Sequence, residues 1–591
     1  MSEIEGNTPD NNDSLICDED RDPVDESFTV NDVDQEDSED ILHNEQRILM
    51  LPFGGTEEIG MNMTTYHYNG YWIMIDCGAG FVGGDIPGVD IMVPNTQFIE
   101  EKIKENLLGA IITHAHEDHC GGLRYLWSKL KCPIYATNFT ANFIKRKNKD
   151  IPDEYINCVN TRDGLTLENF HINFMELTHS VPEMQALSIT INKISGHKYR
   201  ILHTGDWKID EDPVVGKKFE ELELKKFTSD RVDMMVCDST NIFTEGFSKS
   251  ESTLYSSLND IISGCKKLIV VTLFASNIAR LHTVSKIAAN HNRKVAIVGR
   301  SLSDIISVAH ESGYLNDFHY LTPEEARHIP KDKLLLICTG CQGDELASIN
   351  KLANQIHPVF TLEEDDTVIF SSKIIPGNEK RIFSILNKFT RLGVQVITER
   401  NHNVHVSGHP YRGELNYMYD LVKPKAAIPV HGEHMHVKEH VKLVRSLGIN
   451  SMIVENGDVI WLDSYDGMPT KISSVDTSFL CVDGTVLQDP EGLVIKCRKR
   501  LALAGIVCVF ILVKRKDYSL VKTPYIVAPG LTINRKLLEG ISTALAKGIK
   551  KMEKPVKNEI IRLARSEIKK AIKYTGKSGY LVEVCIDLIN S

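Results

Sequence analysis

Four residues within a stretch of six could hold a metal ion: His114, His116, Asp118 and His119. Imidazole nitrogen and carboxylate oxygen are ligands that zinc prefers, so side chains at these alternating and adjacent positions can converge on one or two divalent cations. The alternative is a histidine-rich surface loop that binds nothing. The spacing His-x-His-x-Asp-His, placed directly after a short apolar run, weighs against that alternative. The stretch predicts a metal site.

More polar residues follow strand-like segments further along the chain. They are Asp76, His179, Asp206, Asp238 and His431. A lone histidine or aspartate after a strand is usually structural, and Asp76 in particular could cap the turn that follows it. Proteins of the α/β class, however, present their site residues at the carboxyl ends of strands, and a carboxylate there can support a metal ligand from behind. The recurrence therefore predicts that these residues gather at one site.

The elements that would position them fall into two sets. Before residue 246, apolar strands such as 71–75 and 170–177 precede the candidate ligands. From about 250 to 400, helix-like and strand-like segments alternate, which indicates a second α/β unit with a parallel sheet. The strand-like stretch before His431 resembles the earlier strand ends. The chain thus returns to its first domain after an inserted second one.

The strands of the inserted segment end in small polar residues. These loops are residues 275–277, 299–301, 339–343 and 371–372. Loops of Gly, Ser and Thr at the ends of parallel strands expose N–H groups and hydroxyls, which suits phosphate binding. They also occur simply because tight turns need them. Repetition at four strand ends favours contact with phosphate.

Length and composition limit the class of protein. A chain of 591 residues is too long for one core, and 42% hydrophobic with 25% charged residues is typical of a soluble globular protein. The longest apolar run, 502–513, is too short to span a bilayer and indicates a buried strand. Thirteen cysteines without a repeating spacing, and no export signal at the start, indicate free thiols in the cytoplasm.

Charge is distributed unevenly. Of the net charge of −13, −16 lies in residues 1–46, which leaves +3 for the rest of the chain. That segment is poor in apolar residues, so we expect a disordered tail that solubilises the protein, or alternatively an arm that binds a partner or modulates access of RNA. From Lys496 onward basic residues accumulate around two helical stretches, 536–551 and 557–574. Such charge suits a polyanion, although charged runs are often only solvated faces.

These patterns predict five segments. They are a disordered acidic tail at 1–46, the first part of the metal-binding domain at 47–245, an inserted α/β domain at 246–403, the second part of the metal-binding domain at 404–465, and a basic C-terminal domain at 466–591.

Over residues 47–591 the chain resembles the ribonuclease J family, in the β-CASP branch of the metallo-β-lactamase superfamily. The resemblance rests on Asp76, on the motif at 114–119, on His179 and Asp206, and on Asp238, His409 and His431 as the three β-CASP motifs. The stretches 54–60 and 429–433 also match the family. It implies a metallo-β-lactamase αββα sandwich, an inserted α/β β-CASP domain and a small α+β C-terminal domain.

The resemblance further implies a centre with two Zn²⁺ per subunit, Mn²⁺ being the alternative metal. One ion would be held by His114, His116 and His179, the other by Asp118, His119 and His431, with Asp206 between them and Asp76 orienting the site. His409, placed by Asp238, would protonate the leaving oxygen. Residues that would hold neighbouring phosphates are His405, Ser407, Gly408, Ser371 and Ser372.

The activity implied is hydrolysis of RNA, both from the 5′ end towards the 3′ end and internally, in maturation of ribosomal RNA and decay of messenger RNA. A homodimer or homotetramer formed through the C-terminal domain, association with a helicase or the ribosome, and no membrane contact are implied as well. Cys341 and the segment 410–412 depart from the family pattern near the phosphate loops. An RNA-binding scaffold of a degradation complex and a DNA-end nuclease of the same branch are the competing functions.

Overall fold

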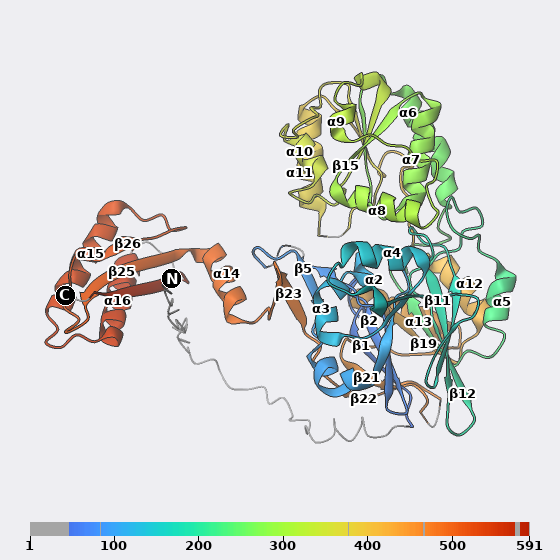
Figure 1. Ribbon diagram of the computed structural model, residues 1–591, viewed down its shortest axis with the longest axis horizontal. Coiled ribbons are helices and arrows are strands. Elements are labelled where there is room, and N and C mark those ends of the chain that lie inside the picture. The colour runs from blue at the N-terminus through green and yellow to red at the C-terminus, as the bar shows by residue number, and fades with distance from the viewer. Residues whose placement is uncertain are drawn as a thin grey trace, which may run out of the picture. The chain divides into compact units, whose positions relative to one another are not determined.

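The computed structural model describes residues 46–82, 84, 86–375, 377–464, 467–573 and 579–589. The chain folds into two compact units (Figure 1). The larger holds the described residues from Gln46 to Leu487 except 86–88, and the smaller holds 86–88 and the residues from Gln488 onward. The predicted acidic tail, residues 1–46, lies outside the described residues except for Gln46.

Two mixed sheets face each other in the larger unit. The first has the strand order β22-β21-β1-β2-β3-β6-β7-β8 and the second β20-β19-β13-β12-β11-β10-β9. The strands of the first are β1 (Leu49–Gly54), β2 (Met63–Tyr68), β3 (Tyr71–Ile75), β6 (Leu107–Ile111), β7 (Ile134–Ala136), β8 (Ile156–Cys158), β21 (Asp458–Trp461) and β22 (Thr470–Ser474). Those of the second are β9 (Leu165–Leu167), β10 (Phe170–Glu176), β11 (Gln185–Asn192), β12 (Lys198–His203), β13 (Met234–Asp238), β19 (Ala426–Val430) and β20 (Asn450–Ser451).

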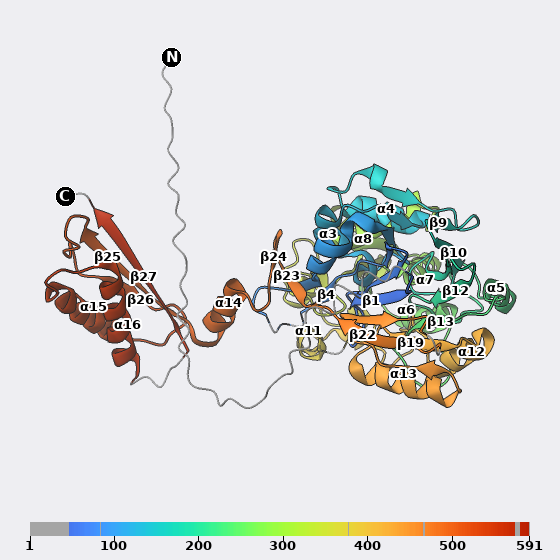
Figure 2. The ribbon, with the colours of Figure 1, turned by 90° about the horizontal axis from the view of Figure 1, so that it is seen from below.

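Helices cover the outer faces of both sheets, so the domain has four layers (Figure 2). The outer helices are α3 (Leu123–Leu130) and α4 (Asn138–Lys147) on the first sheet, and α5 (Glu221–Phe227), α12 (Arg412–Val422) and α13 (His434–Ser446) on the second. Strand β1 is apolar on both faces because each face is covered. Leu49 and Leu51 pack towards α3 and α4, whereas Met50 packs between the two sheets. The predicted αββα sandwich is confirmed.

The inserted domain is a parallel sheet between two helix layers (Figure 1). Its strand order is β15-β16-β14-β17-β18, and all its pairings are parallel, as predicted. The strands are β14 (Ile269–Thr272), β15 (Lys294–Val298), β16 (Leu334–Cys338), β17 (Thr367–Phe370) and β18 (Gln395–Ile397). Helices α6 (Leu254–Gly264), α7 (Ile278–Asn290) and α8 (Arg300–Glu311) cover one face, and α9 (Pro323–Ala326), α10 (Ser348–Ala353) and α11 (Glu379–Arg391) the other.

One buried arginine joins the inserted domain to both chain segments that connect it to the sandwich. Arg280 of α7 is fully buried and donates through Nε and Nη2 to the carboxylate of Glu251, which lies on the entering segment. Its Nη1 donates to Ser371 O and Oγ, at the end of β17, and to Val404 O, on the returning segment. The guanidinium of Arg280 thereby binds both connecting segments to α7.

The sandwich extends further along the chain than the sequence indicates. Strand β22 pairs with β21, and β23 (Phe479–Asp483) pairs with β5 (Ile91–Pro94) in a small sheet that also includes β4 (Gly80–Phe81) and β24 (Val486–Gln488). The C-terminal unit therefore begins at Gln488, which corrects the expected boundary at residue 466.

The smaller unit is a three-stranded sheet with helices on one face. Its strands are β25 (Ile506–Lys514), β26 (Tyr525–Val527) and β27 (Leu581–Ile589), and its helices are α14 (Leu493–Ala504), α15 (Arg535–Lys550) and α16 (Lys557–Ile572). Val507, Val509 and Ile511 alternate inwards against α15 and α16. The apolar run 502–513 is thus a strand only from Ile506, because Gly505, with φ of +78°, separates it from α14. Among the helices of the described residues, none is both long and apolar enough to cross a membrane.

We expect Arg280→Met to lower the free energy of unfolding of the larger unit by about 3–5 kcal/mol, because it leaves the Glu251 carboxylate buried without its partner. Urea unfolding followed by tryptophan fluorescence measures this, since Trp72, Trp127, Trp207 and Trp461 all lie in that unit. Adding Glu251→Leu should restore much of the loss, and Lys442→Met, an exposed lysine on α13, should leave the midpoint unchanged. An Arg280→Met midpoint equal to that of the parent would contradict the account.

Candidate metal centre

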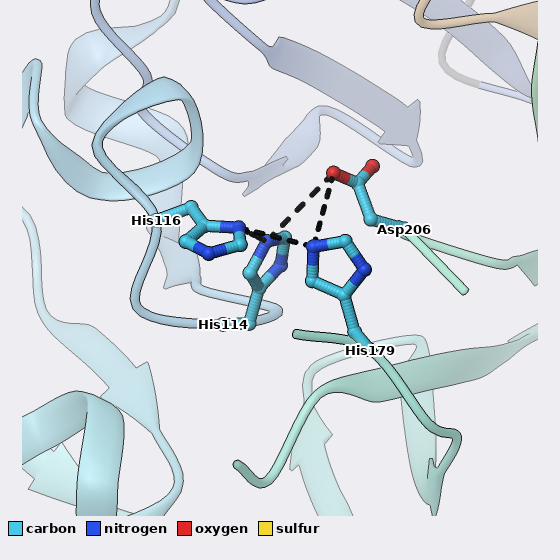
Figure 3. Close-up of side chains that lie close together, drawn as sticks. All are labelled: His114, His116, His179 and Asp206. Carbon is cyan, nitrogen blue, oxygen red and sulfur yellow. Dashed lines mark hydrogen bonds and ion pairs between the residues drawn. The ribbon is translucent and has the colours of Figure 1, made fainter. Parts of the chain in front are cut away.

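Three imidazoles and one carboxylate oxygen converge at the carboxyl ends of strands β6, β10 and β12 (Figure 3). His116 Nδ1 lies 3.0 Å from His114 Nε2 and 3.1 Å from His179 Nε2. The same His114 and His179 nitrogens lie 3.8 and 3.9 Å from Asp206 Oδ2. Ligand atoms of four residues so close together form a cage of the kind that holds a divalent cation.

A second group shares Asp206 with the first. His119 Nε2 lies 3.1 Å from Asp206 Oδ2 and 3.7 Å from Asp118 Oδ2, and His431 Nε2 lies 3.3 Å from Asp118 Oδ2. His431 follows β19, which the chain reaches only after the inserted domain. The carboxylate of Asp206 therefore stands between two groups of ligands, as expected for two metal ions with one bridging residue.

Three of the imidazoles, those of His119, His179 and His431, are oriented by an oxygen partner at Nδ1. His119 Nδ1 lies 2.7 Å from Asp76 Oδ2, and His179 Nδ1 lies 2.7 Å from Gly408 O. The hydroxyl of Thr240 lies 2.9 Å from His431 Nδ1. With Nδ1–H donating to these oxygens, the Nε2 lone pair of each ring is directed into the centre. Asp76 also accepts from the Thr113 N–H at 2.7 Å, which fixes its own position.

Two of these residues have unusual backbone conformations. Asp76 and His431 have φ of +62° and +53°, which side chains other than glycine rarely adopt. Such conformations cost about 1–3 kcal/mol each and cluster at functional sites. At Gly408 a Cβ atom would lie 2.8 Å from the ring of His179, so only glycine fits there.

A third histidine–aspartate pair borders the two groups. His409 Nδ1 lies 2.8 Å from Asp238 Oδ2 and 3.9 Å from Asp206 Oδ2. Asp238 ends β13, and its other oxygen accepts from Thr240 at 2.7 Å. His409 is the more accessible partner, with 21% of its side chain exposed. A partly exposed imidazole beside buried ligands could exchange a proton with a bound molecule.

The electrostatics of the first group favour the forms of its side chains that bind metal. Burial lowers the pKa of His116 to about 4 and that of His114 and His179 well below the ordinary value, so these imidazoles are neutral. Burial alone would raise the pKa of Asp206, but His119 and His431 hold it well below its ordinary value. Neutral imidazole and ionised carboxylate are the forms that bind metal. In the second group, although burial opposes it, Asp206 and the neighbouring carboxylates raise the pKa of His431 to about 10 and that of His119 well above its ordinary value. These two rings are protonated without metal, so a metal ion that binds them must displace their protons.

The predicted phosphate-binding residues differ in whether their side chains are free to contact a phosphate. Ser371 is buried, and its hydroxyl donates to Val404 O at 2.7 Å while accepting from Arg280. It has no proton left to donate to a phosphate, so the prediction for Ser371 is corrected. Ser372 lies beside the thiol of Cys341, whose pKa burial raises to about 12.

The remaining predicted phosphate contacts lie on the segment 405–408. Ser407 Oγ accepts from Asn241 Nδ2 at 2.8 Å and from the N–H of His409 at 3.2 Å. Burial, with a smaller effect of Arg280, lowers the pKa of His405 to about 3, which keeps its imidazole neutral. Gly408 acts on the centre through its carbonyl, which binds His179.

Sequence reasoning missed several residues that hold the site together. They are Asn62, Thr113, Thr240, Asn241, Glu251 and Arg280. Thr113 directly precedes His114, and Thr240 and Asn241 lie two and three residues after Asp238, which is a signal that could have found them. Arg280 and Glu251 carry no such signal, because their partners are far away in sequence.

Four family models match consecutive parts of the chain. They are the beta-lactamase superfamily domain at residues 71–227, the beta-CASP domain of ribonuclease J at 266–389, the RNA specificity domain of Zn-dependent metallo-hydrolases at 393–454, and the C-terminal domain of ribonuclease J at 493–582.

Curated relatives match across most of the chain. Ribonuclease J of Sinorhizobium meliloti is 36% identical over 499 residues, covering 83% of this chain and 87% of the relative. Ribonuclease J of Corynebacterium glutamicum is 32% identical over 83% of this chain and 68% of its own length. That of Mycolicibacterium smegmatis is 30% identical over 89% and 94%. Together with the His/Asp cluster, these similarities support a site for divalent metal.

We expect zinc to raise the thermal midpoint of the metal-stripped protein, because a ligand that binds only the folded state stabilises it, by about 2.7 kcal/mol at a hundredfold excess over Kd. Asp206→Asn should abolish most of this rise, because it removes charge from both ligand groups. Differential scanning calorimetry measures the shift. His328→Ala, which removes an exposed histidine outside the cluster, is the matched control and should keep the full rise. A full rise in Asp206→Asn would contradict a shared ligand.

Proposed function

The chain belongs to the ribonuclease J family, and on that premise we propose that it is a metal-dependent ribonuclease that hydrolyses phosphodiester bonds of RNA. One observation carries the proposal. The carboxylate of Asp206, which is common to both groups of candidate ligands, lies 3.9 Å from Nδ1 of His409. His409 itself belongs to neither of these two groups. Metal ligands and a separate proton donor, side by side, are what hydrolysis of a phosphodiester needs.

In this proposal two zinc ions occupy the two groups, with Mn²⁺ as the alternative. His114, His116 and His179 would hold one ion and Asp118, His119 and His431 the other, with Asp206 as the residue common to both groups. A pair of such ions would supply hydroxide at neutral pH and offset the charge that develops on the phosphate. Asp76 holds His119 in the tautomer that the centre requires.

His409 acts as the general acid. Burial opposes it, but Asp238 and Asp206 raise the pKa of His409 above its ordinary value, so the ring carries a proton near neutral pH. Asp238 accepts a hydrogen bond from Nδ1–H of His409, so Nε2 of His409 points away from Asp238. That nitrogen protonates the departing oxygen of the cleaved ester, a transfer worth about 10²–10⁴-fold in rate.

In this proposal the segment 405–408 and Ser372 hold the phosphate next to the cleaved bond, and Ser407 and Gly408 line a pocket there together with His179 and Lys208. A closed pocket that binds the terminal 5′ phosphate would place the first phosphodiester bond at the metal centre. The RNA would then be cleaved one nucleotide at a time from the 5′ end towards the 3′ end. RNA that passes the pocket would be cut internally. Ser371 and Arg280 support this pocket from behind, since their hydrogen bonds hold the end of β17 against Val404.

The smaller unit supplies an assembly surface. The face of its sheet opposite α15 and α16 carries Cys508, Phe510 and Leu512 on β25, of which Phe510 is 43% exposed. A second copy could cover this apolar face, in a homodimer or homotetramer. Basic residues of the same unit suit RNA, a helicase complex or the ribosome. Ribosomal RNA maturation and messenger decay in the cytoplasm are the processes that fit.

We expect end-labelled RNA with a 5′ monophosphate to release mononucleotides, and the same RNA with a 5′ triphosphate or hydroxyl to be cut only internally. The reason is that the pocket accommodates a single terminal phosphate. Denaturing gels with nucleotide standards separate the two outcomes. A DNA oligomer of the same sequence is the matched control, and equal turnover of RNA and DNA would contradict the ribonuclease assignment. Binding of RNA without any cleavage would instead favour a scaffold.

We expect His409→Asn to lower kcat on RNA about 10²–10⁴-fold, but to slow a substrate with a p-nitrophenol leaving group much less, because that leaving group needs no proton. Stopped-flow assays of both substrates measure the difference, and zinc content should be unchanged. His402→Ala, an exposed histidine on the same segment, is the control. Equal losses on the two substrates would contradict the general-acid role.

A further inference from the structure

An exposed aromatic ring lies beside the metal centre. Phe243 follows Asp238 on the loop after β13, and 50% of it is exposed although its neighbour Ile242 is fully buried. Its ring meets the imidazole of His436 edge to face, with centroids 5.2 Å apart and planes at 63°. An exposed aromatic ring can stack against a planar group of a bound molecule.

Hydrogen bonds tie this pair to the centre. Asn241, two residues before Phe243, donates from Nδ2 to Ser407 Oγ at 2.8 Å and to His409 O at 3.3 Å. His436 lies in the first turn of α13. It packs closely against Gly432, because a Cβ atom added to Gly432 would lie 2.8 Å from the Cβ atom of His436. Gly432 directly follows His431. The pair therefore lies on the rim between the segment of the general acid and a metal ligand.

Packing does not account for either ring. Phe243 belongs to none of the hydrophobic clusters formed by the described residues. His436 Nδ1 is buried and has no hydrogen-bond partner among the described residues. A ring held only by its neighbour, next to a catalytic centre, has no evident structural purpose.

We propose that Phe243, backed by His436, forms a platform on which the nucleobase of a nucleotide flanking the cleaved phosphate stacks. This proposal rests on the ribonuclease function and adds a base-binding subsite to it. Every base has an aromatic face, so the platform accepts any sequence, as a degradative nuclease requires. The T-shaped contact with His436 can cover at most one face of the Phe243 ring, which leaves the other face for the base.

Fluorescence of 2-aminopurine tests the platform directly, because stacking on an aromatic ring quenches it. The probe is a 5′-monophosphorylated RNA with 2-aminopurine at its first or second position and phosphorothioate linkages that resist cleavage. Zinc-loaded parent protein should quench at one of the two positions. Phe243→Ala should lose this quenching and bind roughly 5- to 150-fold more weakly, whereas Phe243→Trp should retain both.

Phe247→Ala is the matched control, because Phe247 is 57% exposed on the same loop but packs towards Tyr417. It should keep the quenching and affinity of the parent. Unchanged quenching and affinity in Phe243→Ala would overturn the platform. Turnover of unmodified RNA, measured in parallel, reports on the ribonuclease function separately, so a failure of one is not mistaken for a failure of the other.

Discussion

The carboxylate of Asp206 is the interaction on which the rest of the site depends. It is 2% exposed and lies within reach of five imidazoles, four of which follow three strands, β6, β10 and β19, while the fifth lies on the segment before α12. An ionised carboxylate in such a position is costly unless cations compensate it. The two sheets of the sandwich bring parallel strand ends together at one edge, so the ligands meet there without any loop having to span the domain.

The inserted domain matters because the centre is incomplete without the chain that follows it. His409 and His431 come after residue 403, and the segment that carries His409 is held by Arg280 from within the insertion. The position of His409 thus depends on the contacts that Arg280 makes from within the insertion. In the proposed mechanism, most of the metal ligands come from the first part of the chain, whereas the proton donor and the phosphate contacts come from the insertion and the segment that follows it.

The sequence predicted those features that depend on local pattern. The candidate metal ligands after β6, β10, β12 and β19 were predicted because each follows an apolar strand, and the parallel sheet was predicted from alternating helices and strands. The boundary at Gln488 was missed because β23 pairs with β5, nearly four hundred residues earlier in the chain. Ser371 was misassigned because a serine at a strand end looks the same whether its hydroxyl faces solvent or a buried carbonyl. Arg280 was missed because a buried charge is recognised only by its partners.

The central claim is that Asp206 bridges two metal ions. X-ray diffraction from zinc-soaked crystals, collected at the zinc absorption edge, tests it most directly. The account predicts two anomalous peaks about 3.5–4 Å apart, one beside His114, His116 and His179 and the other beside His119 and His431, with Asp206 between them. A single peak, or peaks that do not contact Asp206, would contradict it.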